Sequence, residues 1–137
     1  MSHDNLVLQF APLGRCAFRF TPEIVRAFIP LRRIGVYLLF YEQKAIYIGR
    51  SDTCLCTRLA YHPYLRRASH FTYEICKTSC RAFCLEAYWF HRLQRASPDR
   101  LLNCNHPGKP RAVTQSCPFC NPNDSKALNL VASKFGY

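Results

Sequence analysis

The amino-acid sequence predicts an α+β fold in which three short strands alternate with helices, followed by a segment rich in cysteine and histidine. Apolar, partly β-branched stretches at 34–40 and 45–48, separated by a polar break, predict a β-hairpin. A third strand is expected over 71–76 for the same reason. Apolar spacing and a proline stop predict helices over about 52–62 and 78–94.

The length of 137 residues suits one compact domain with appended elements. Threonine, proline and glutamate at 21–23 predict the start of a short helix within an N-terminal extension at 1–32. We expect a central domain at 33–103. The remaining residues, 104–137, are expected to form a Cys/His-rich loop and a terminal helix over 125–135 packed on that domain.

The charge of the chain predicts a polyanionic partner. Lysine and arginine number 19 against 8 acidic residues, which gives a formal net charge of +11. The basic residues are spread among tyrosine, phenylalanine and histidine, as on a folded surface that binds nucleic-acid phosphates. Simple solubility and an anionic membrane surface are the alternatives.

The cysteine content argues against secretion. Nine cysteines is an odd number, and residues 1–10 lack a basic start followed by a long apolar run. The longest apolar stretch, 36–41, is much too short to cross a bilayer, so no membrane partner is expected. We therefore expect a cytoplasmic protein with reduced thiols.

Two tripeptides carry the first candidate functional residues. Gly-Val-Tyr at 35–37 and Tyr-Ile-Gly at 47–49 place Tyr37 and Tyr47 on the two adjacent strands of the predicted hairpin. Either tripeptide alone is weak evidence, because a single tyrosine on a strand usually serves packing.

Two basic residues follow on the predicted helix over 52–62. Arg58 and His62 are four residues apart and so would lie on one helix face. Together they offer a fixed cation for a phosphate oxygen and an imidazole that moves or orients a proton near neutral pH. A solvated basic face is the alternative interpretation.

Glu86 is a carboxylate on an apolar helix face. Its neighbours three residues before and four and seven residues after are Phe83, Phe90 and Leu93. An unpaired charge there would be costly, so Glu86 requires a partner. That partner is either an arginine in a salt bridge or a hard divalent cation.

The ordered set of these residues resembles the GIY-YIG nuclease family, which includes intron homing endonucleases, the incision nuclease of bacterial excision repair and some restriction enzymes. The resemblance covers about half of the chain. Val36 stands in place of the middle isoleucine, and the turn before Arg58 is one residue longer than in many members. The matching residues are Gly35, Tyr37, Tyr47, Gly49, Arg58, His62, Glu86 and Asn103.

The resemblance implies a three-stranded antiparallel sheet flanked by helices and hydrolysis of a DNA phosphodiester with one divalent metal ion, Mg²⁺ or Mn²⁺. Glu86 would hold the metal, and Arg58 would balance the charge that develops on the phosphate. Tyr37, helped by His62, would deprotonate or position the attacking water. Tyr47 would form a hydrogen bond to the phosphate or the water.

Three further positions of the family pattern have structural roles under this resemblance. Gly35 and Gly49 belong to the strands, and the Asn103 amide would tie a loop to the core. Asn105 is the competing candidate for the family asparagine. Arg50 or Lys44 could add a phosphate contact.

The C-terminal segment predicts a structural Zn²⁺ site. Cys104, His106, Cys117 and Cys120 offer four ligands, the last two in a CxxC motif within a polar loop that contains prolines. A distant cysteine, Cys54 or Cys56, could replace His106, and paired free thiols without a metal are the alternative. Elsewhere, the predicted role of three cysteines spaced every four residues is apolar packing: Cys76, Cys80 and Cys84.

The sequence thus predicts a divalent-metal-dependent DNA endonuclease with a structural zinc site. A non-catalytic, zinc-stabilised nucleic-acid-binding module is the alternative, although a pure binder does not require a buried carboxylate that repels phosphate. The oligomeric state and the preferred DNA target stay open.

Overall fold

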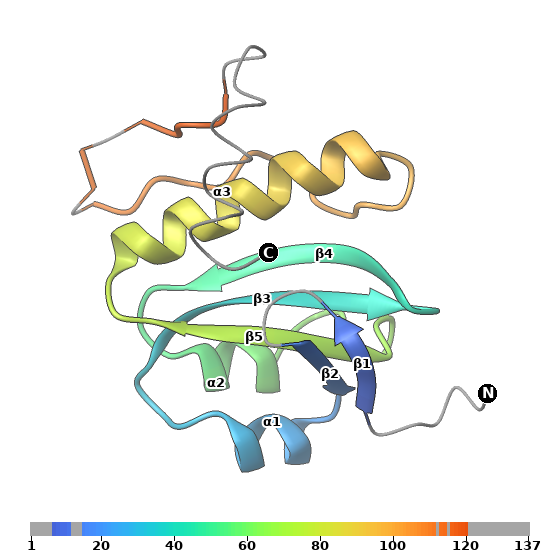
Figure 1. Cartoon of the computed structure of the whole chain (residues 1–137). Helices are drawn as coiled ribbons and strands as arrows, with labels where there is room; N and C mark the ends of the chain where they lie inside the picture. The colour runs from blue at the N-terminus through green and yellow to red at the C-terminus, as the bar shows by residue number, and fades with distance from the viewer. Residues whose placement is uncertain (1–6, 12–14, 112, 115, 121–137) are drawn as a thin grey trace.

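The computed structural model describes residues 7–11, 15–111, 113, 114 and 116–120. The chain forms one five-stranded antiparallel sheet with the strand order β1-β2-β5-β3-β4. The elements are β1 (Val7–Ala11), β2 (Arg15–Arg19), α1 (Pro22–Phe28), β3 (Ile34–Tyr41), β4 (Lys44–Ser51), α2 (Leu55–Ala60), β5 (His70–Cys76) and α3 (Ser79–Ala96). Helix α3 covers one face of the sheet, and α1 and α2 lie on the other (Figure 1). The predicted α+β class is confirmed.

The predicted number of three strands is wrong. The expected strands are present as β3, β4 and β5, but β1 and β2 extend the sheet from the segment that was expected to be an N-terminal extension. Strand β2 pairs with β5 through Phe18 opposite Phe71, and the Phe18 ring stacks on Phe28 at 4.6 Å between centroids. Residues 1–20 have no clear apolar period, so the pairing depends on packing between residues far apart in the chain.

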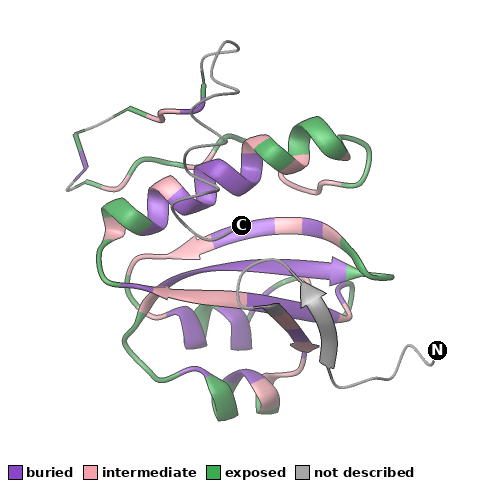
Figure 2. Cartoon of the chain, in the orientation of Figure 1, coloured by how far each residue is buried: buried purple, intermediate pink, exposed green. Residues whose placement is uncertain are grey.

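The two faces of the sheet bury two separate apolar clusters (Figure 2). Along β3, Val36 and Leu38 pack toward α3, whereas Tyr37 and Leu39 pack toward α1 and α2. This alternation follows from the pleat of a strand, in which successive side chains point to opposite faces. Tyr37 therefore belongs to the face that α2 covers.

A β-bulge in β4 changes the alternation near the candidate site. Leu39 pairs with Tyr47 and Phe40 pairs with Ala45, so Ile46 has no partner on β3. Ile46 and Tyr47 consequently both pack with the cluster on the side of α1 and α2. Tyr47 pairs with Leu39 and therefore faces the same side as Tyr37 by ordinary alternation, and the bulge adds Ile46 to that side.

The helix α2 is shorter than expected and ends at Ala60. His62 lies in the following turn, where its backbone N–H donates to the Leu59 carbonyl at 3.2 Å. The prediction that Arg58 and His62 share one helix face is wrong in this detail. The two side chains nevertheless converge, because the turn folds His62 back over the sheet.

The C-terminal segment packs against α3 as a loop over its described part, up to Cys120. The helix expected over 125–135 lies outside the described residues. Among the helices described, none combines the length and the apolar character that a membrane span requires.

Asn103 joins the segment after α3 to the edge strand β4. Its side-chain amide donates to the Ile48 carbonyl at 2.8 Å, and its oxygen accepts from the Ile48 N–H at 3.0 Å. The neighbouring Leu102 N–H donates to the Ile46 carbonyl at 2.7 Å. Asn105, the competing candidate, is exposed. The amide thus satisfies both backbone groups of Ile48 on the open edge of β4.

Asn103→Ala should destabilise the protein by about 1–3 kcal/mol, because it removes two partly buried hydrogen bonds and leaves the Ile48 backbone groups unpaired. Chemical denaturation measures the change in the free energy of unfolding. Asn105→Ala, an equivalent truncation at an exposed position, is the control and should unfold like the parent. Equal stability of the two variants would contradict the role assigned to Asn103.

Candidate functional site

The candidate site is centred on the Tyr37 side chain, which is buried on the face of β3 and β4 that α2 covers. Tyr37 pairs with Gly49 across the two strands. A Cβ atom added at Gly49 would overlap the Cζ and Oη atoms of Tyr37. The absence of a side chain at Gly49 is therefore what allows the phenol ring to lie across β4, the edge strand of the sheet.

Arg58 and His62 converge on the Tyr37 hydroxyl. The His62 Nε2 atom lies 2.8 Å from Tyr37 Oη, and Arg58 Nε donates to the same oxygen at 3.4 Å. The Tyr64 backbone N–H donates to His62 Nδ1 at 3.0 Å. Because Nδ1 accepts a hydrogen bond, the proton of the neutral ring is assigned to Nε2, which donates to Tyr37.

The protonation states follow from burial. Removal from solvent, with a smaller effect of the Arg58 charge, lowers the pKa of His62 to about 4, so the ring is neutral near pH 7. Burial also raises the pKa of the Tyr37 hydroxyl above its ordinary value. Tyr37 is thus a phenol whose two acceptor positions are taken by His62 and Arg58, and its own O–H is left to donate to a third group.

Tyr47 and Tyr64 complete an aromatic cluster around His62. The Tyr47 ring stacks on Tyr37 at 6.1 Å between centroids and meets His62 edge-on at 5.3 Å. Tyr64 contacts Tyr47 edge-on, also at 5.3 Å. These contacts hold the His62 ring on several sides and orient its Nε2 atom toward Tyr37.

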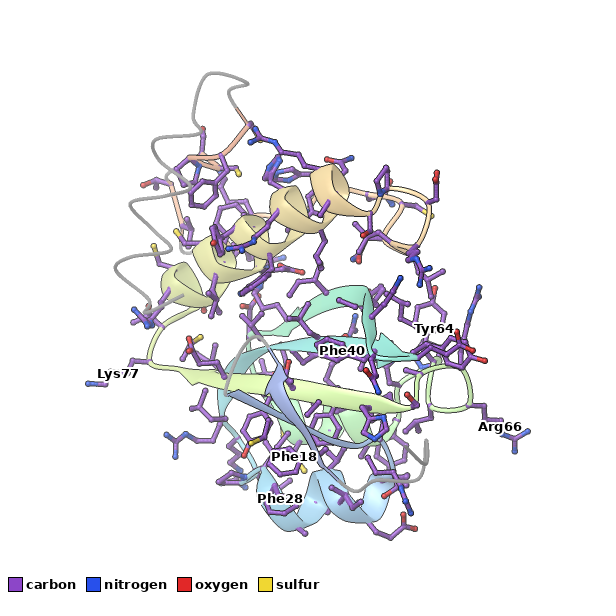
Figure 3. The ribbon with its side chains drawn as sticks, turned by 45° about the vertical axis from the view of Figure 1, so that its right-hand side comes forward. Phe18, Phe28, Phe40, Tyr64, Arg66 and Lys77 are labelled. Carbon is purple, nitrogen blue, oxygen red and sulfur yellow. The ribbon has the colours of Figure 1, made fainter. Side chains whose placement is uncertain are left out.

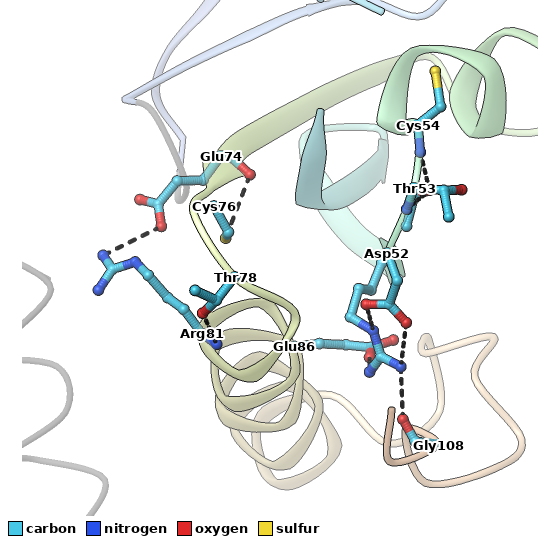
Figure 4. Close-up of polar contacts among 11 residues, drawn as sticks. Asp52, Thr53, Cys54, Glu74, Cys76, Thr78, Arg81, Glu86 and Gly108 are labelled. Atoms are coloured by element: carbon cyan, nitrogen blue, oxygen red, sulfur yellow. Dashed lines mark hydrogen bonds and ion pairs between the residues drawn. The ribbon is translucent and has the colours of Figure 1, made fainter. Parts of the chain in front are cut away.

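Glu86 binds Arg50, a partner that the sequence analysis considered only as a possible phosphate contact. Arg50 Nη1 donates to Glu86 Oε1 at 2.7 Å. The same guanidinium donates to both carboxylate oxygens of Asp52 and, from Nη2, to the Gly108 carbonyl at 2.7 Å (Figure 4). The sequence offered one signal for this network, namely an acid two residues after Arg50.

Burial dominates the ionisation of Glu86. Removal from solvent raises the pKa of the carboxyl to about 7, against the opposing effect of the Arg50 charge. The negative charge of Glu86 in turn raises the pKa of Tyr37. The carboxyl group on α3 and the phenol on β3 therefore lie within electrostatic range of each other, although the Tyr37 ring packs on the face of the sheet opposite α3.

The predicted catalytic residues Tyr37, Tyr47, Arg58, His62 and Glu86 thus gather in one region. The carboxylates of Glu86 and Asp52 both accept hydrogen bonds from the Arg50 guanidinium, which lies between them. A cation bound by Glu86 would have to compete with this arginine.

A second cluster of potential ligands lies between α3 and the C-terminal loop. Its ligand atoms lie within 4.8 Å of one another and belong to His91, His106, Cys117 and Cys120. The shortest separations are 3.2 Å, from His106 Nε2 to His91 Nε2 and to Cys120 Sγ. This group could hold a metal such as zinc.

The structure brings His91 into this cluster, whereas the predicted ligand Cys104 lies outside it. The Cys104 side chain is exposed and donates to the Leu102 carbonyl at 3.7 Å. His91 could not be recognised as a metal ligand from the sequence, because it fitted the apolar spacing of the long helix. In the structure it is half-buried and faces the loop that carries the CxxC motif.

The other cysteines lie outside this cluster. Cys56, named as an alternative ligand, is buried in α2, and Cys54 lies at the start of α2, where its sulfur accepts from the Arg32 N–H. Cys76 is buried, as expected for a packing residue, but Cys80 is exposed, so the packing prediction is wrong for that position.

The raised pKa of Glu86 predicts a pH-dependent stability. The carboxyl titrates near pH 7 in the folded protein and near pH 4.5 when unfolded. The stability that depends on the protonated carboxyl group is therefore fully present below about pH 4.5 and is lost as the pH rises through about 7. Glu86→Gln does not titrate. The free energy of unfolding of the parent should therefore fall relative to this variant between pH 5 and pH 8, by a few kcal/mol at most.

Arg50→Gln gives the opposite control, because loss of the arginine should raise the pKa of Glu86 further and move the loss of stability to higher pH. Unfolding curves of the parent and the Glu86→Gln variant that run parallel from pH 5 to pH 8 would contradict the assignment.

Comparisons of the chain with family models, curated proteins and solved structures find no match. The functional assignment therefore depends on the residues and their geometry.

Proposed function

We propose that this protein is a divalent-metal-dependent DNA endonuclease of the GIY-YIG type that hydrolyses phosphodiester bonds. The observation that carries the proposal is the convergence of His62 and Arg58 on the buried hydroxyl of Tyr37, with the Glu86 charge within range. The formal net charge of +11 supports a nucleic-acid substrate.

The cost of burying these groups supports a functional role for them. His62 and Glu86 are buried polar residues in a domain whose other interior positions are mostly apolar. Buried charged pairs seldom stabilise a protein more than apolar residues of similar size would. Glu86 and His62 have perturbed pKa values, which are typical of functional sites. At such sites, buried polar groups are retained for their function although they lower the stability of the protein.

The hydrogen bonds suggest how Tyr37 acts. Because its oxygen accepts from His62 and Arg58, its O–H can donate to a phosphate oxygen or to the attacking water. The same two donors would stabilise a phenolate if Tyr37 gave up its proton. In this arrangement His62 positions Tyr37 and does not take its proton, which differs from the helper role expected from the sequence.

Arg58 and Glu86 supply the two charges of the proposed site. Arg58 is partly exposed and could contact a phosphate while it holds Tyr37, which would balance negative charge that develops during hydrolysis. Glu86, with Asp52 beside it, would hold Mg²⁺ or Mn²⁺. Such an ion, when bound, polarises the scissile phosphate. Arg50 neutralises Glu86 as long as no cation does so.

A non-catalytic nucleic-acid-binding module is the second candidate. The Arg50–Glu86 ion pair favours it, because this pair gives Glu86 a structural partner that requires no metal. The two candidates differ in one measurable property, namely cleavage that depends on a divalent metal ion.

We further infer that the cluster of His91, His106, Cys117 and Cys120 binds structural Zn²⁺. Two imidazole nitrogens and two thiolates are a common tetrahedral zinc set, and four protein ligands leave no open position for catalysis. Burial raises the pKa of the Cys117 thiol to about 11, so metal binding would have to displace its proton. The ion would tie α3 to the loop that contains Gly108, the residue that contacts Arg50.

Glu86→Gln and Tyr37→Phe should each lower Mg²⁺-dependent cleavage of plasmid DNA by orders of magnitude, because one loses the metal-binding charge and the other loses the hydroxyl that acts at the phosphate. Binding to DNA in EDTA should stay equal or become tighter for Glu86→Gln, since an anion near the phosphate has been neutralised. Cleavage assays and binding titrations on both variants measure these effects.

Glu23→Gln and Tyr61→Phe, whose side chains are exposed, are the matched controls and should cleave like the parent. Full cleavage by Glu86→Gln would remove the metal-ligand assignment. If the parent itself shows no cleavage with Mg²⁺ or Mn²⁺, the binding module is the correct interpretation.

Purified protein should contain about one Zn²⁺ per chain, and His91→Ala or the pair Cys117→Ser with Cys120→Ser should lose it, because each removes ligands from the cluster. Elemental analysis by mass spectrometry measures the content. Cys104→Ser is the discriminating control and should keep its zinc. If Cys104→Ser loses zinc and His91→Ala retains it, the ligand set expected from the sequence holds and the set in the structure does not.

A further inference from the structure

A hollow with an excess of positive charge lies beside the turn between β3 and β4. It has a volume of about 500 Å³. Its charged lining consists of three arginines and one aspartate, Arg66, Arg67, Arg100 and Asp99. Figure 3 shows Arg66 and Tyr64 at this end of the molecule and Lys77 at the opposite end.

Three segments that are distant in the sequence build this hollow. Arg66 and Arg67 belong to the connection between α2 and β5, which is attached to β3 through a hydrogen bond from the Ser69 N–H to the Phe40 carbonyl at 2.8 Å. Arg100 follows α3, in the segment that is attached to β4 through the Leu102 N–H. Backbone hydrogen bonds thus hold the arginines near one another in the absence of any ligand.

The charges of the hollow favour an anion. Three guanidinium groups stand against one carboxylate, and all four side chains are exposed. Within the described part of the chain, no ion pair joins Arg66, Arg67 or Arg100 to an acidic side chain. Arginines gathered with so little acidic compensation repel one another, and a phosphate group would relieve this repulsion with hydrogen bonds from the planar guanidinium. A merely solvated basic surface would not require a hollow.

A series of ring contacts connects the hollow to the candidate site. The Arg67 guanidinium lies over the Tyr64 ring at 5.9 Å, and Tyr64 contacts Tyr47, which stacks on Tyr37. Ile46 lines the hollow and directly precedes Tyr47 on β4. Because of the bulge in β4, Ile46 and Tyr47 pack on the same side of the sheet. One extended polyanion could therefore contact both places.

We propose that this hollow is a second phosphate-binding site, which holds a backbone phosphate of duplex DNA while another phosphate of the same molecule lies at the exposed Arg58 guanidinium beside Tyr37. The inference rests on the proposed function for the identity of the ligand. The hollow reads no base sequence, because arginine contacts to phosphate position the duplex without distinguishing bases.

The test measures the affinity for a duplex oligonucleotide in EDTA over a series of salt concentrations, so that no cleavage is required. Arg66→Gln and Arg100→Gln should each weaken binding several-fold and lower the slope of log affinity against log salt by about one. Lys77→Gln removes the same charge at the opposite end of the molecule and is the matched control. It should leave the slope nearly unchanged.

Two further variants test the direction of the effect. Asp99→Asn removes the only acid that lines the hollow and should tighten binding. Arg66→Lys keeps the charge and should restore most of the salt slope, which separates the loss of a phosphate contact from damage to the fold. Melting temperatures of all variants check that each one folds.

The inference is overturned if Arg66→Gln and Arg100→Gln bind like Lys77→Gln, or if the parent does not bind duplex DNA. Its failure is distinct from that of the proposed function. A parent that cleaves DNA while the arginine variants bind normally retains the nuclease assignment and loses the second site. A parent that binds through these arginines but never cleaves retains the site and loses the nuclease assignment.

Discussion

The Arg50 guanidinium connects three parts of the molecule that carry the candidate chemistry. It donates to Glu86 on α3, to Asp52 beyond the end of β4 and to the Gly108 carbonyl in the C-terminal loop, and it lies over the Phe83 ring at 5.6 Å. A planar group with five donors suits such a junction, since it can serve several acceptors in one plane. Removal of Arg50 would leave a buried carboxyl without its compensating charge, and the position of Glu86 relative to the sheet depends on this contact.

The Tyr37 hydroxyl is placed by a different kind of constraint, which is steric. The ring crosses β4 only because Gly49 has no side chain, and Tyr47 faces the same side of the sheet because it pairs with Leu39, two residues after Tyr37 on β3. His62 and Arg58 then meet one oxygen atom from the turn and the helix beyond β4. The chemistry of this hydroxyl thus depends on backbone geometry that two short motifs in the sequence encode.

The local elements could be predicted from the sequence, whereas the catalytic role of the site residues stays a prediction. The hairpin of β3 and β4, the strand β5 and the helix α3 follow from apolar spacing and capping residues, and Tyr37, Arg58 and Glu86 followed from motif order. Three features could not be predicted in this way. The β1–β2 hairpin lacks a periodic pattern in the sequence, and the end of α2 at Ala60 depends on the packing of the next turn. His91 has the spacing of an apolar position of α3, although its side chain faces the CxxC loop.

The sequence by itself determined which residue types are present at which spacing, and so the α+β class, the basic charge and the two groups of chemistry-bearing residues. The tertiary structure decided which of them meet. Arg50 and Glu86 are 36 residues apart, Arg50 and Gly108 are 58 apart, and His91 and Cys120 are 29 apart. The spacing of residues in the sequence constrains the backbone only over a few turns of a helix or a few residues of a strand. Which residues meet across tens of positions depends instead on the burial of shared surface and on the cost of leaving a polar group without a partner.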